Sequence, residues 1–332
     1  MSRERRYGGL LLALIVLWSV SPLLYYAFAT YDLPADRGRY FKIPTGSTLR
    51  EISFALRDQG IIEHPYVFMS LVYLRGGETR LHAGTYRFED RMSMMKIVDD
   101  LTQGRVADIP ITIPEGLAFP DIAEIVSRTI GQERSEVDGL VRDPELLSLL
   151  DSEAPSLEGF LFPDTYAVPI DIEAKEIFRL MIKRYREVFD DNLRRRAQEL
   201  GFSEVEIVTL ASIIEKETRL KSERRLISGV FHKRLRKGIP LEADPTVRYA
   251  LGKTTGPLVY KDLEVDSPYN TYRRGGLPPG PICSPGKASL IAALYPEEAD
   301  HLYFVATGEG NHVFSATLEE HNLAKQKVRK FD

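Results

Sequence analysis

The most apolar part of the chain lies at its N-terminus. Residues 7–30 contain no charged side chain, and their core reads GGLLLALIVLWSVSPLLYYAFA. At 1.5 Å per residue, a helix of this length crosses the hydrocarbon core of a bilayer, which is about 30 Å thick. Three arginines within residues 1–6 precede it, and a basic flank stays in the cytoplasm. The pattern predicts a cytoplasmic tail at 1–6, one membrane-spanning helix at 7–30, and the rest of the chain outside.

A cleaved signal peptide is the alternative to this anchor. Ala27-Phe28-Ala29 has the small-x-small pattern of a cleavage site. However, the apolar run is longer than an ordinary signal-peptide core of about 7–15 residues, and Tyr25 and Tyr26 crowd the site. These features favour the uncleaved helix.

A strand–turn–helix pattern repeats after a short polar linker at 31–40. Ile43–Ser53 and Ile113–Ala123 each contain a Pro-x-Gly turn, and apolar side chains then recur three and four residues apart, as in an amphipathic helix. A looser copy runs from Gly84 to Gly104. This order resembles LysM-like modules, which are small βααβ units that recognise N-acetylglucosamine polymers. The resemblance predicts a LysM-like α/β module at 41–110, ending in an alternating strand.

Residues 117–200 are predicted to be mainly helical, with an amphipathic helix at Glu173–Phe189. The basic clusters at 183–186 and 194–196 belong to such helices and are interpreted as solvated helix surface. One segment interrupts the helices. Leu157–Tyr166 combines aromatic side chains with glycine, proline and two carboxylates, which predicts a structured loop.

Ser203 begins the helix that carries the candidate chemistry. Glu206 follows three positions later and completes a capping box. The next eight residues are nearly all apolar, which predicts a buried central helix that ends with Glu215, Lys216 and Glu217. A carboxylate on a buried stripe is costly unless it is paired or protonated, and the protonated form suits a general acid. A solvated helix end is the simpler interpretation, and periodicity does not choose between the two glutamates.

Turn-rich, polar segments follow this helix. They are Leu241–Val247, Asp266–Tyr272, Gly275–Ile282 and Ser284–Gly286, the last preceding a helix predicted at Lys287–Leu294. Such loops cannot form a core of their own, so we expect them to pack over the buried helix as the walls of a groove. Further on, 301–306 and 312–315 predict a β-hairpin.

Charge and composition narrow the classes of function. The formal net charge of -4 leaves no excess positive charge for a phosphate backbone, so no nucleic-acid partner is expected. Six histidines and a single cysteine, Cys283, leave little material for a zinc site or a disulfide framework. Neither a metal nor a cofactor is predicted, and Cys283 is interpreted as structural.

Five motifs occur in the order found in one enzyme family. They are Glu158–Tyr166, Leu210–Glu217, Asp244–Val247, Tyr269–Tyr272 and Gly276–Ile282. With these motifs the chain resembles the endolytic murein transglycosylases of the YceG-like family over nearly its whole length. The predicted fold is α+β: an N-terminal transmembrane helix, the small LysM-like module, and a larger mixed α+β catalytic domain at 111–332 built around the buried helix.

The resemblance also implies a site and a reaction. The family's catalytic glutamate follows Ala-Ser-Ile-(Ile/Val), which maps to Glu215. The implied reaction cleaves the MurNAc–GlcNAc β-1,4 bond of nascent peptidoglycan glycan strands, leaves 1,6-anhydro-MurNAc ends and so terminates strand elongation. Candidate substrate-binding residues are Glu158, Tyr166, Asp244, Thr246, Asn270, Tyr272 and Ser284. Glu242 stands where some relatives have Gln, so a substrate contact at this position is not assigned.

The implied location is the bacterial cytoplasmic membrane, with the N-terminus inside and the catalytic domain on the outer, periplasmic side. Glycan strands are the expected partner there, with peptidoglycan synthases beside them.

A single glutamate suffices for such an enzyme, because the C6 hydroxyl of the substrate itself attacks the anomeric carbon, whereas ordinary glycosidases need two carboxylates. Two alternatives remain. The first is a hydrolytic muramidase, with Glu217, Asp244 or Glu158 as its second carboxylate. The second is a non-catalytic, membrane-anchored wall-binding scaffold that acts through its LysM-like module.

Overall fold

The computed structural model describes most of the chain, and its fold is mixed α+β. The described residues are 21, 25–32, 40–76, 81–89, 91–150, 152–218, 220–298, 300–308 and 310–328. Helices predominate in this part of the chain, and its strands form four two-stranded sheets. The membrane span predicted at 7–30 lies mostly outside the described residues. Among the helices that are described, none is both long and apolar enough to cross a membrane.

The chain divides into two compact units. Unit 1 is Met1–Ile109 with Ala167–Asp171, and unit 2 is Pro110–Tyr166 with Ile172–Asp332. The division passes through two strands that form one sheet, β5 (Asp108–Thr112) and β6 (Thr165–Pro169). The segment Ala167–Asp171, which contains the last three residues of β6, therefore belongs to unit 1, although it follows part of unit 2 in the sequence.

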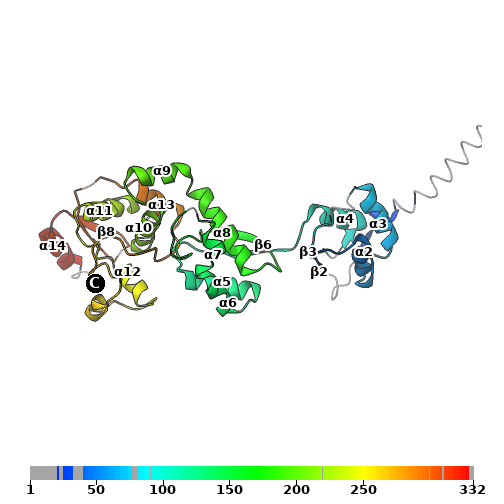
Figure 1. The fold of residues 1–332 in the computed structure, drawn as a ribbon, viewed down its shortest axis with the longest axis horizontal. Coiled ribbons are helices and arrows are strands. Elements are labelled where there is room, and N and C mark those ends of the chain that lie inside the picture. Colours follow the sequence, from blue (N-terminus) through cyan, green and yellow to red (C-terminus); the bar gives the residue numbers. More distant parts are fainter. Residues whose placement is uncertain are drawn as a thin grey trace, which may run out of the picture. The chain divides into compact units, whose positions relative to one another are not determined.

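Along the sequence of unit 1, two helices lie between two strands that pair with each other. Its elements are β1 (Thr30–Asp32), β2 (Tyr40–Ile43), α2 (Leu49–Asp58), α3 (Pro65–Leu74), β3 (Gly84–Arg87), β4 (Arg91–Ser93) and α4 (Met94–Gln103) (Figure 1). The strands β2 and β3 pair antiparallel, with Tyr40 opposite Arg87. Residues 40–87 thus follow the order strand, helix, helix, strand. β1 pairs with β4, so Thr30, predicted as the end of the membrane helix, and residues 31 and 32, predicted as linker, form a strand instead. Tyr40, also predicted as linker, begins β2.

The amphipathic patterns of these helices close one core. Leu56 of α2, Phe68 of α3 and Tyr86 of β3 are fully buried in it. At the start of α2, Thr48 and Glu51 form a capping box, in which each side chain accepts a hydrogen bond from the backbone N–H of the other. The repeated pattern recognised in the sequence therefore corresponds to real strand–helix junctions.

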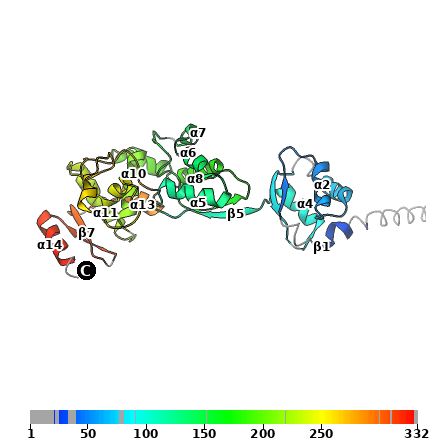
Figure 2. The ribbon, with the colours of Figure 1, turned by 90° about the horizontal axis from the view of Figure 1, so that it is seen from below.

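Unit 2 is mainly helical. Its helices are α5 (Phe119–Ile130), α6 (Arg134–Gly139), η1 (Leu140–Arg142), α7 (Pro144–Leu147), α8 (Ala174–Val188), α9 (Asp191–Glu199), α10 (Glu204–Glu217), α11 (Arg224–Arg236), α12 (Asp244–Ala250), η2 (Tyr260–Glu264), α13 (Lys287–Leu294) and α14 (Leu318–Val328). α5 packs against α6 and α8 (Figure 2). α8 and α13 confirm the helices predicted at Glu173–Phe189 and Lys287–Leu294.

The helix predicted to be central, α10, packs against α9, α11, α12 and α13 (Figure 1). Residues 207–214 are all buried. Both hydrogen bonds of the predicted capping box are present, since the Ser203 hydroxyl accepts from the Glu206 N–H and the Glu206 carboxylate accepts from the Ser203 N–H. The capping box therefore fixes the start of the helix, and the burial of residues 207–214 holds the rest of it in place.

A C-terminal hairpin completes unit 2. β7 (Tyr303–Ala306) pairs antiparallel with β8 (His312–Ser315), and α14 packs on both strands. The backbone N–H of His312 donates to Oε1 of Glu223 at 3.0 Å, and the ring Nδ1 of His312 lies 2.7 Å from Oε2. Glu223 immediately precedes α11, so the hairpin is fastened to the start of that helix.

Candidate active site

Glu215 lies in the last turn of α10, where the buried part of the helix ends. Its side chain is only 6% exposed. Oε1 accepts a hydrogen bond from Nη2 of Arg224 at 2.7 Å, and Oε2 accepts one from the backbone N–H of Gly286 at 3.0 Å. Each carboxylate oxygen has a donor, so the side chain is held in one orientation. Of the two ways in which a buried carboxylate becomes tolerable, the structure has the paired one.

Arg224, the first residue of α11, is buried between two carboxylates. Oε2 of Glu115 lies 3.9 Å from the same Nη2 that contacts Glu215. The Glu115 side chain is 47% exposed and comes from the Pro-x-Gly turn that precedes α5. Sequence reasoning missed both Arg224 and Glu115 as site residues. Their contacts join segments far apart in the chain, and the only available signal was the glutamate inside the repeated turn motif.

Two loops meet beside Glu215. The N–H of Gly116 donates to the carbonyl of Ser284 at 2.9 Å, and the N–H of Ser284 donates to the carbonyl of Leu117 at 2.8 Å. Nζ of Lys216 donates to the carbonyl of Gly116 at 3.1 Å. Gly116 has a φ of +79°, and a Cβ at this position would lie 3.6 Å from Cγ of Glu215. The turn before α5 thus forms one side of the site.

The segment before Ser284 is hydrogen-bonded to Ser212 of α10. The N–H of Ile282 donates to Oγ of Ser212 at 3.0 Å, and the thiol of Cys283 donates to the Ser212 carbonyl at 3.4 Å. Cys283 is fully buried, and burial raises the pKa of its thiol well above the ordinary value. The thiol therefore packs in the core, and the Leu210–Glu217 and Gly276–Ile282 motifs are in direct contact.

Glu217 lies beside Asp244, the first residue of α12. Burial, and then the negative charge of Asp244, raise the pKa of Glu217 to about 8. Its carboxyl is therefore mostly protonated at neutral pH. Tyr272 completes this group, because its hydroxyl donates to Oδ1 of Asp244 at 2.6 Å. A helix turns by about 100° per residue, so Glu215 and Glu217 face different surroundings.

Comparison with known sequences identifies the family of the chain. A model of the YceG-like family matches residues 41–327, a range that contains Glu115, Glu215, Arg224 and Gly286. The chain belongs to the YceG-like family.

The relatives of this YceG-like protein include enzymes with a curated name. It is 36% identical over 304 residues to the endolytic murein transglycosylase of Bacillus subtilis (strain 168), covering 86% of this chain and 83% of that protein. It is 29% identical over 315 residues to the endolytic murein transglycosylase of Streptococcus pneumoniae (strain R6), covering 84% of this chain and 56% of that longer protein. A crystal structure of a yceG-like protein from Listeria monocytogenes superposes with a TM-score of 0.61 at 36% identity, covering 87% of this chain and 99% of that one.

Two of the predicted substrate-binding residues of the YceG-like protein are buried and bonded to the backbone. The hydroxyl of Thr246 donates to the carbonyl of Ala243 at 2.7 Å. The side-chain amide of Asn270 donates to the carbonyls of Leu263 and Val265 at 2.9 and 2.8 Å. These two side chains therefore fix the loops around the Asp244–Tyr272 pair.

The other predicted residues differ in accessibility. Asp244 is exposed, and Tyr272 and Tyr166 are partly exposed. The Tyr166 hydroxyl donates to the carbonyl of Phe162 at 2.6 Å. Ser284 is buried, and it joins the two loops through its backbone as described above. The accessible predicted residues are thus the carboxylate and the two tyrosines.

Glu158 is buried and holds the start of α5. Both of its carboxylate oxygens lie 3.1 Å from the N–H of Phe119, the first residue of that helix, and the hydroxyl of Tyr249 donates to Oε2 at 3.2 Å. Burial raises the pKa of Glu158 to about 7, against the opposing effect of these hydrogen bonds. Glu158 therefore caps the N-terminus of α5 from within the core of the YceG-like protein.

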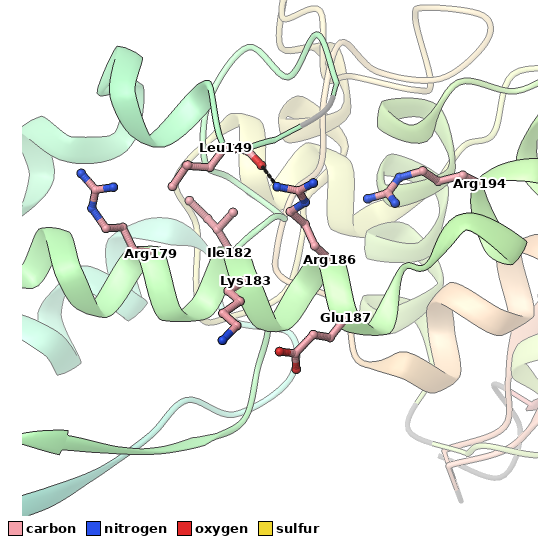
Figure 3. A pocket seen from close by; sticks show the side chains of 7 residues that line it. All are labelled: Leu149, Arg179, Ile182, Lys183, Arg186, Glu187 and Arg194. Atoms are coloured by element: carbon pink, nitrogen blue, oxygen red, sulfur yellow. Dashed lines mark hydrogen bonds between the residues drawn. The ribbon is translucent and has the colours of Figure 1, made fainter.

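A separate pocket of about 430 Å³ lies along α8 (Figure 3). It is lined by Leu149, Arg179, Ile182, Lys183, Arg186, Glu187 and Arg194. Nη1 of Arg186 donates to the carbonyl of Leu149 at 3.2 Å, and Arg194 pairs with Glu204 at 2.9 Å. The basic clusters interpreted as solvated surface thus contribute in part to internal contacts. Glu215 is not among the lining residues, so this pocket is distinct from the site around it.

Proposed function

We propose that this protein is an endolytic murein transglycosylase that cuts peptidoglycan glycan strands. The observation that carries the proposal is the carboxylate of Glu215, fixed at the end of a buried helix by Arg224 and Gly286. It occurs in a chain 36% identical, over most of its length, to a Bacillus subtilis protein with that name. The substrate bond is the MurNAc–GlcNAc β-1,4 linkage within a strand.

The chemistry requires one group that gives and then takes a proton. Protonated Glu215 donates its proton to the glycosidic oxygen as the bond from that oxygen to the anomeric carbon breaks. The C6 hydroxyl of the same MurNAc attacks the anomeric carbon, and its proton passes to the Glu215 carboxylate. The products are a 1,6-anhydro-MurNAc end and a free hydroxyl on the departing strand. No water is consumed, and Glu215 returns to its starting state.

Arg224 is the positioning residue for this cycle. Its guanidinium donates to Oε1 of Glu215 at 2.7 Å and so holds the carboxylate in position to accept the proton from the C6 hydroxyl. When Glu215 is protonated, the guanidinium has a second carboxylate within 4 Å, that of Glu115. The buried cation therefore keeps a partner in both halves of the reaction, and the cost of leaving it unpaired is avoided.

The groups that bind the sugar come from the accessible part of the motifs. Asp244, Tyr272 and Tyr166 keep exposed surface and are proposed to contact the glycan directly. Thr246, Asn270, Glu158 and Ser284 are buried, so we assign them to the support of these loops.

The location and the module complete the proposal. The apolar run predicted at 7–30, apart from its last residues, which belong to unit 1, anchors the chain in the cytoplasmic membrane, with the N-terminus inside and the catalytic part on the wall side, near peptidoglycan synthases. Residues 41–110 act as a LysM-like glycan-binding module, a role supported by the strand–helix–helix–strand order of residues 40–87.

The mass of the products tests the reaction. Full-length protein is incubated with uncross-linked glycan strands, and the fragments are analysed by mass spectrometry. We expect internal cuts whose new MurNAc ends are lighter by one water than reducing ends. Fragments that all carry reducing MurNAc ends would contradict the transglycosylase mechanism.

A set of glutamine substitutions tests the residue. Glu215→Gln is expected to lower the cleavage rate about a thousandfold, because the amide cannot transfer a proton. Glu217→Gln is expected to stay within about threefold of wild type at pH 7, since that carboxyl is already largely neutral. Glu206→Gln keeps the capping box and serves as the matched control on the same helix. Loss of cleavage in the Glu217 variant alone would reassign the catalytic group.

Hydrolysis is the second candidate function, and Glu115 is the observation that favours it. A muramidase needs a second carboxylate close to its acid, and the Glu115 and Glu215 carboxylates flank one nitrogen of Arg224. In that case Glu115→Gln would abolish cleavage and the wild-type products would carry reducing ends. Under the transglycosylase proposal, Glu115→Gln slows cleavage and leaves the anhydro ends unchanged.

A further inference from the structure

Helix α3 in unit 1 presents an uncharged surface to solvent. Its sequence, PYVFMSLVYL, contains no ionisable acid or base other than tyrosine. One side of the helix packs into the core of unit 1 through residues such as Phe68 and Leu71. On the other side, Tyr66 is 66% exposed, Tyr73 54% and Leu74 72%. Exposed apolar side chains grouped on one helix indicate a surface that another apolar phase covers.

The end of the N-terminal apolar run is packed beside this helix. The ring of Tyr26 meets the ring of His64, the residue before α3, edge to face with centroids 4.3 Å apart. Ala27 is 1% exposed and belongs to the core of unit 1. Its neighbour Phe28, two residues after Tyr26, is 64% exposed and adds an apolar side chain to the surface of unit 1.

The segment that contains Tyr26 and Phe28 leads directly into a strand of unit 1. β1 begins at Thr30, which pairs with Ser93 of β4. Only Ala29 lies between the helical turn that ends at Phe28 and this strand. Residues 27–30 therefore belong to unit 1, and a membrane-spanning helix formed by the residues before Tyr26 would end beside His64, at the start of α3.

We infer that the exposed face of α3, formed by Tyr66, Tyr73 and Leu74 and extended by Phe28, rests in the interfacial layer of the lipid bilayer. The inference builds on the proposed anchor at 7–30. Tyrosine is enriched at the level of the lipid headgroups, where its ring is buried and its hydroxyl stays wet. A helix with such an apolar face lies in the plane of the interface and sinks about 5–10 Å into it.

Two arginines beside this face are compatible with a lipid surface, although they contribute less to the contact than the apolar side chains do. Tyr66 contacts Phe54 edge to face at 5.8 Å, and Arg50 and Arg57 lie over the Phe54 ring at 5.8 and 4.7 Å. Guanidinium groups beside an apolar face suit lipid phosphates. Arg57 is also paired with Asp58 at 2.6 Å, so the apolar contact provides most of the attraction.

Tryptophan fluorescence tests the contact, because the chain has a single tryptophan, Trp18, within the proposed anchor. Trp18→Phe provides a background into which Tyr73→Trp or Tyr66→Trp is introduced. The full-length variants are reconstituted in phosphatidylcholine vesicles with or without bromine on the upper acyl chain. Tyr260→Trp, at a residue 84% exposed in unit 2, is the matched control in the same background.

We expect the brominated lipid to quench about half of the emission at positions 73 and 66, given the depth at which such a helix lies, and to leave position 260 unquenched. Trp18 in the wild-type chain reports on the anchor itself. Quenching of Trp18 without quenching at positions 73 and 66 overturns the inference and leaves the anchor intact. An unquenched Trp18 overturns the anchor and the inference together. Cleavage of soluble glycan strands by the same variants verifies that they are folded.

Discussion

Glu215 and Glu217 are two positions apart on α10, and their carboxyl groups have different neighbours. Nη2 of Arg224 lies 2.7 Å from Oε1 of Glu215, whereas burial and Asp244 raise the pKa of Glu217 to about 8. Both glutamates continue apolar stripes of the same helix. The difference arises from side chains on α11 and α12, which is why periodicity along α10 cannot reveal it.

Arg224 is expected to act on the chemical step. Arg224→Met should lower kcat about a hundredfold and leave KM within about twofold, because the guanidinium orients Glu215 without touching the sugar. Arg224→Lys should restore part of the rate, since it keeps a charge and loses the planar fork. Steady-state kinetics with soluble glycan strands measures both constants.

The neighbouring Arg225 provides the control for this series. It is exposed and donates to the carbonyl of Tyr295, so Arg225→Met should keep nearly the wild-type kcat. A rise in KM at constant kcat in the Arg224 variants would mean that the guanidinium binds substrate instead.

Glu158 is expected to make stability depend on pH. Its pKa is raised to about 7 in the folded chain from an ordinary value of 4.5. The folded state therefore binds more protons than the unfolded state between these values, and stability falls as pH rises from about 5 to 7. The change amounts to about 3 kcal/mol for this residue. Thermal unfolding of wild type and Glu158→Gln at several pH values measures it.

The Glu158→Gln variant should show a flatter pH dependence over this range, because the amide keeps an acceptor for the Phe119 N–H and does not ionise. Glu199→Gln, which removes an exposed carboxylate, should leave the slope as in wild type. A slope that is identical in wild type and the Glu158 variant would disprove the assignment.

At the scale of elements, the sequence predicts a helix end where hydrogen bonds within one turn determine it. Ser203 and Glu206 revealed the start of α10 because both partners of a capping box lie within one turn. The bounds of α13 agree with its predicted range, which begins directly after the Ser284–Gly286 turn. The association of the Pro-x-Gly turn with the Ser284 loop had no such signal, because it consists of backbone hydrogen bonds between distant segments.

The loop at Leu157–Tyr166 shows how two motifs depend on a missing side chain. Gly159 has a φ of +83°, and a Cβ there would lie 2.3 Å from Cβ of Pro281 and 3.2 Å from Cγ1 of Val208. Gly159→Ala should therefore destabilise the fold by roughly 2–5 kcal/mol, from backbone strain together with overpacking. The midpoint of thermal unfolding measures the loss.

Gly201→Ala separates the two causes. Gly201 has a similar φ of +80°, and a Cβ there would meet nothing within 4 Å. We expect this variant to lose only the part due to backbone strain. Equal losses in the two variants would show that the contact with Pro281 costs nothing.

At the scale of the whole molecule, spatial grouping departs from chain order. Residues 167–171 belong to unit 1 although they follow a stretch of unit 2. Asp171 pairs with Lys42 at 3.5 Å, and the N–H of Ile170 donates to the carbonyl of Ala107 at 3.0 Å. Nothing in the composition of five residues marks such a return, so the sequence assigned all of 111–332 to one domain. The predicted succession of anchor, module and catalytic part rests instead on long apolar or patterned segments of the sequence.

The clasp between His312 and Glu223 sets a lower limit on how far the protein can be shortened. All five family motifs end before residue 295, so a shortened protein that stops at 300 would still contain every one of them. It would lack both donors to the Glu223 carboxylate, and the first turn of α11 would lose its fastening together with Arg224. We expect such a fragment to cleave glycan at least about tenfold more slowly than one ending at 328, in a side-by-side assay of soluble strands. The smallest active enzyme would then have to include a C-terminal hairpin that itself contacts no reacting atom.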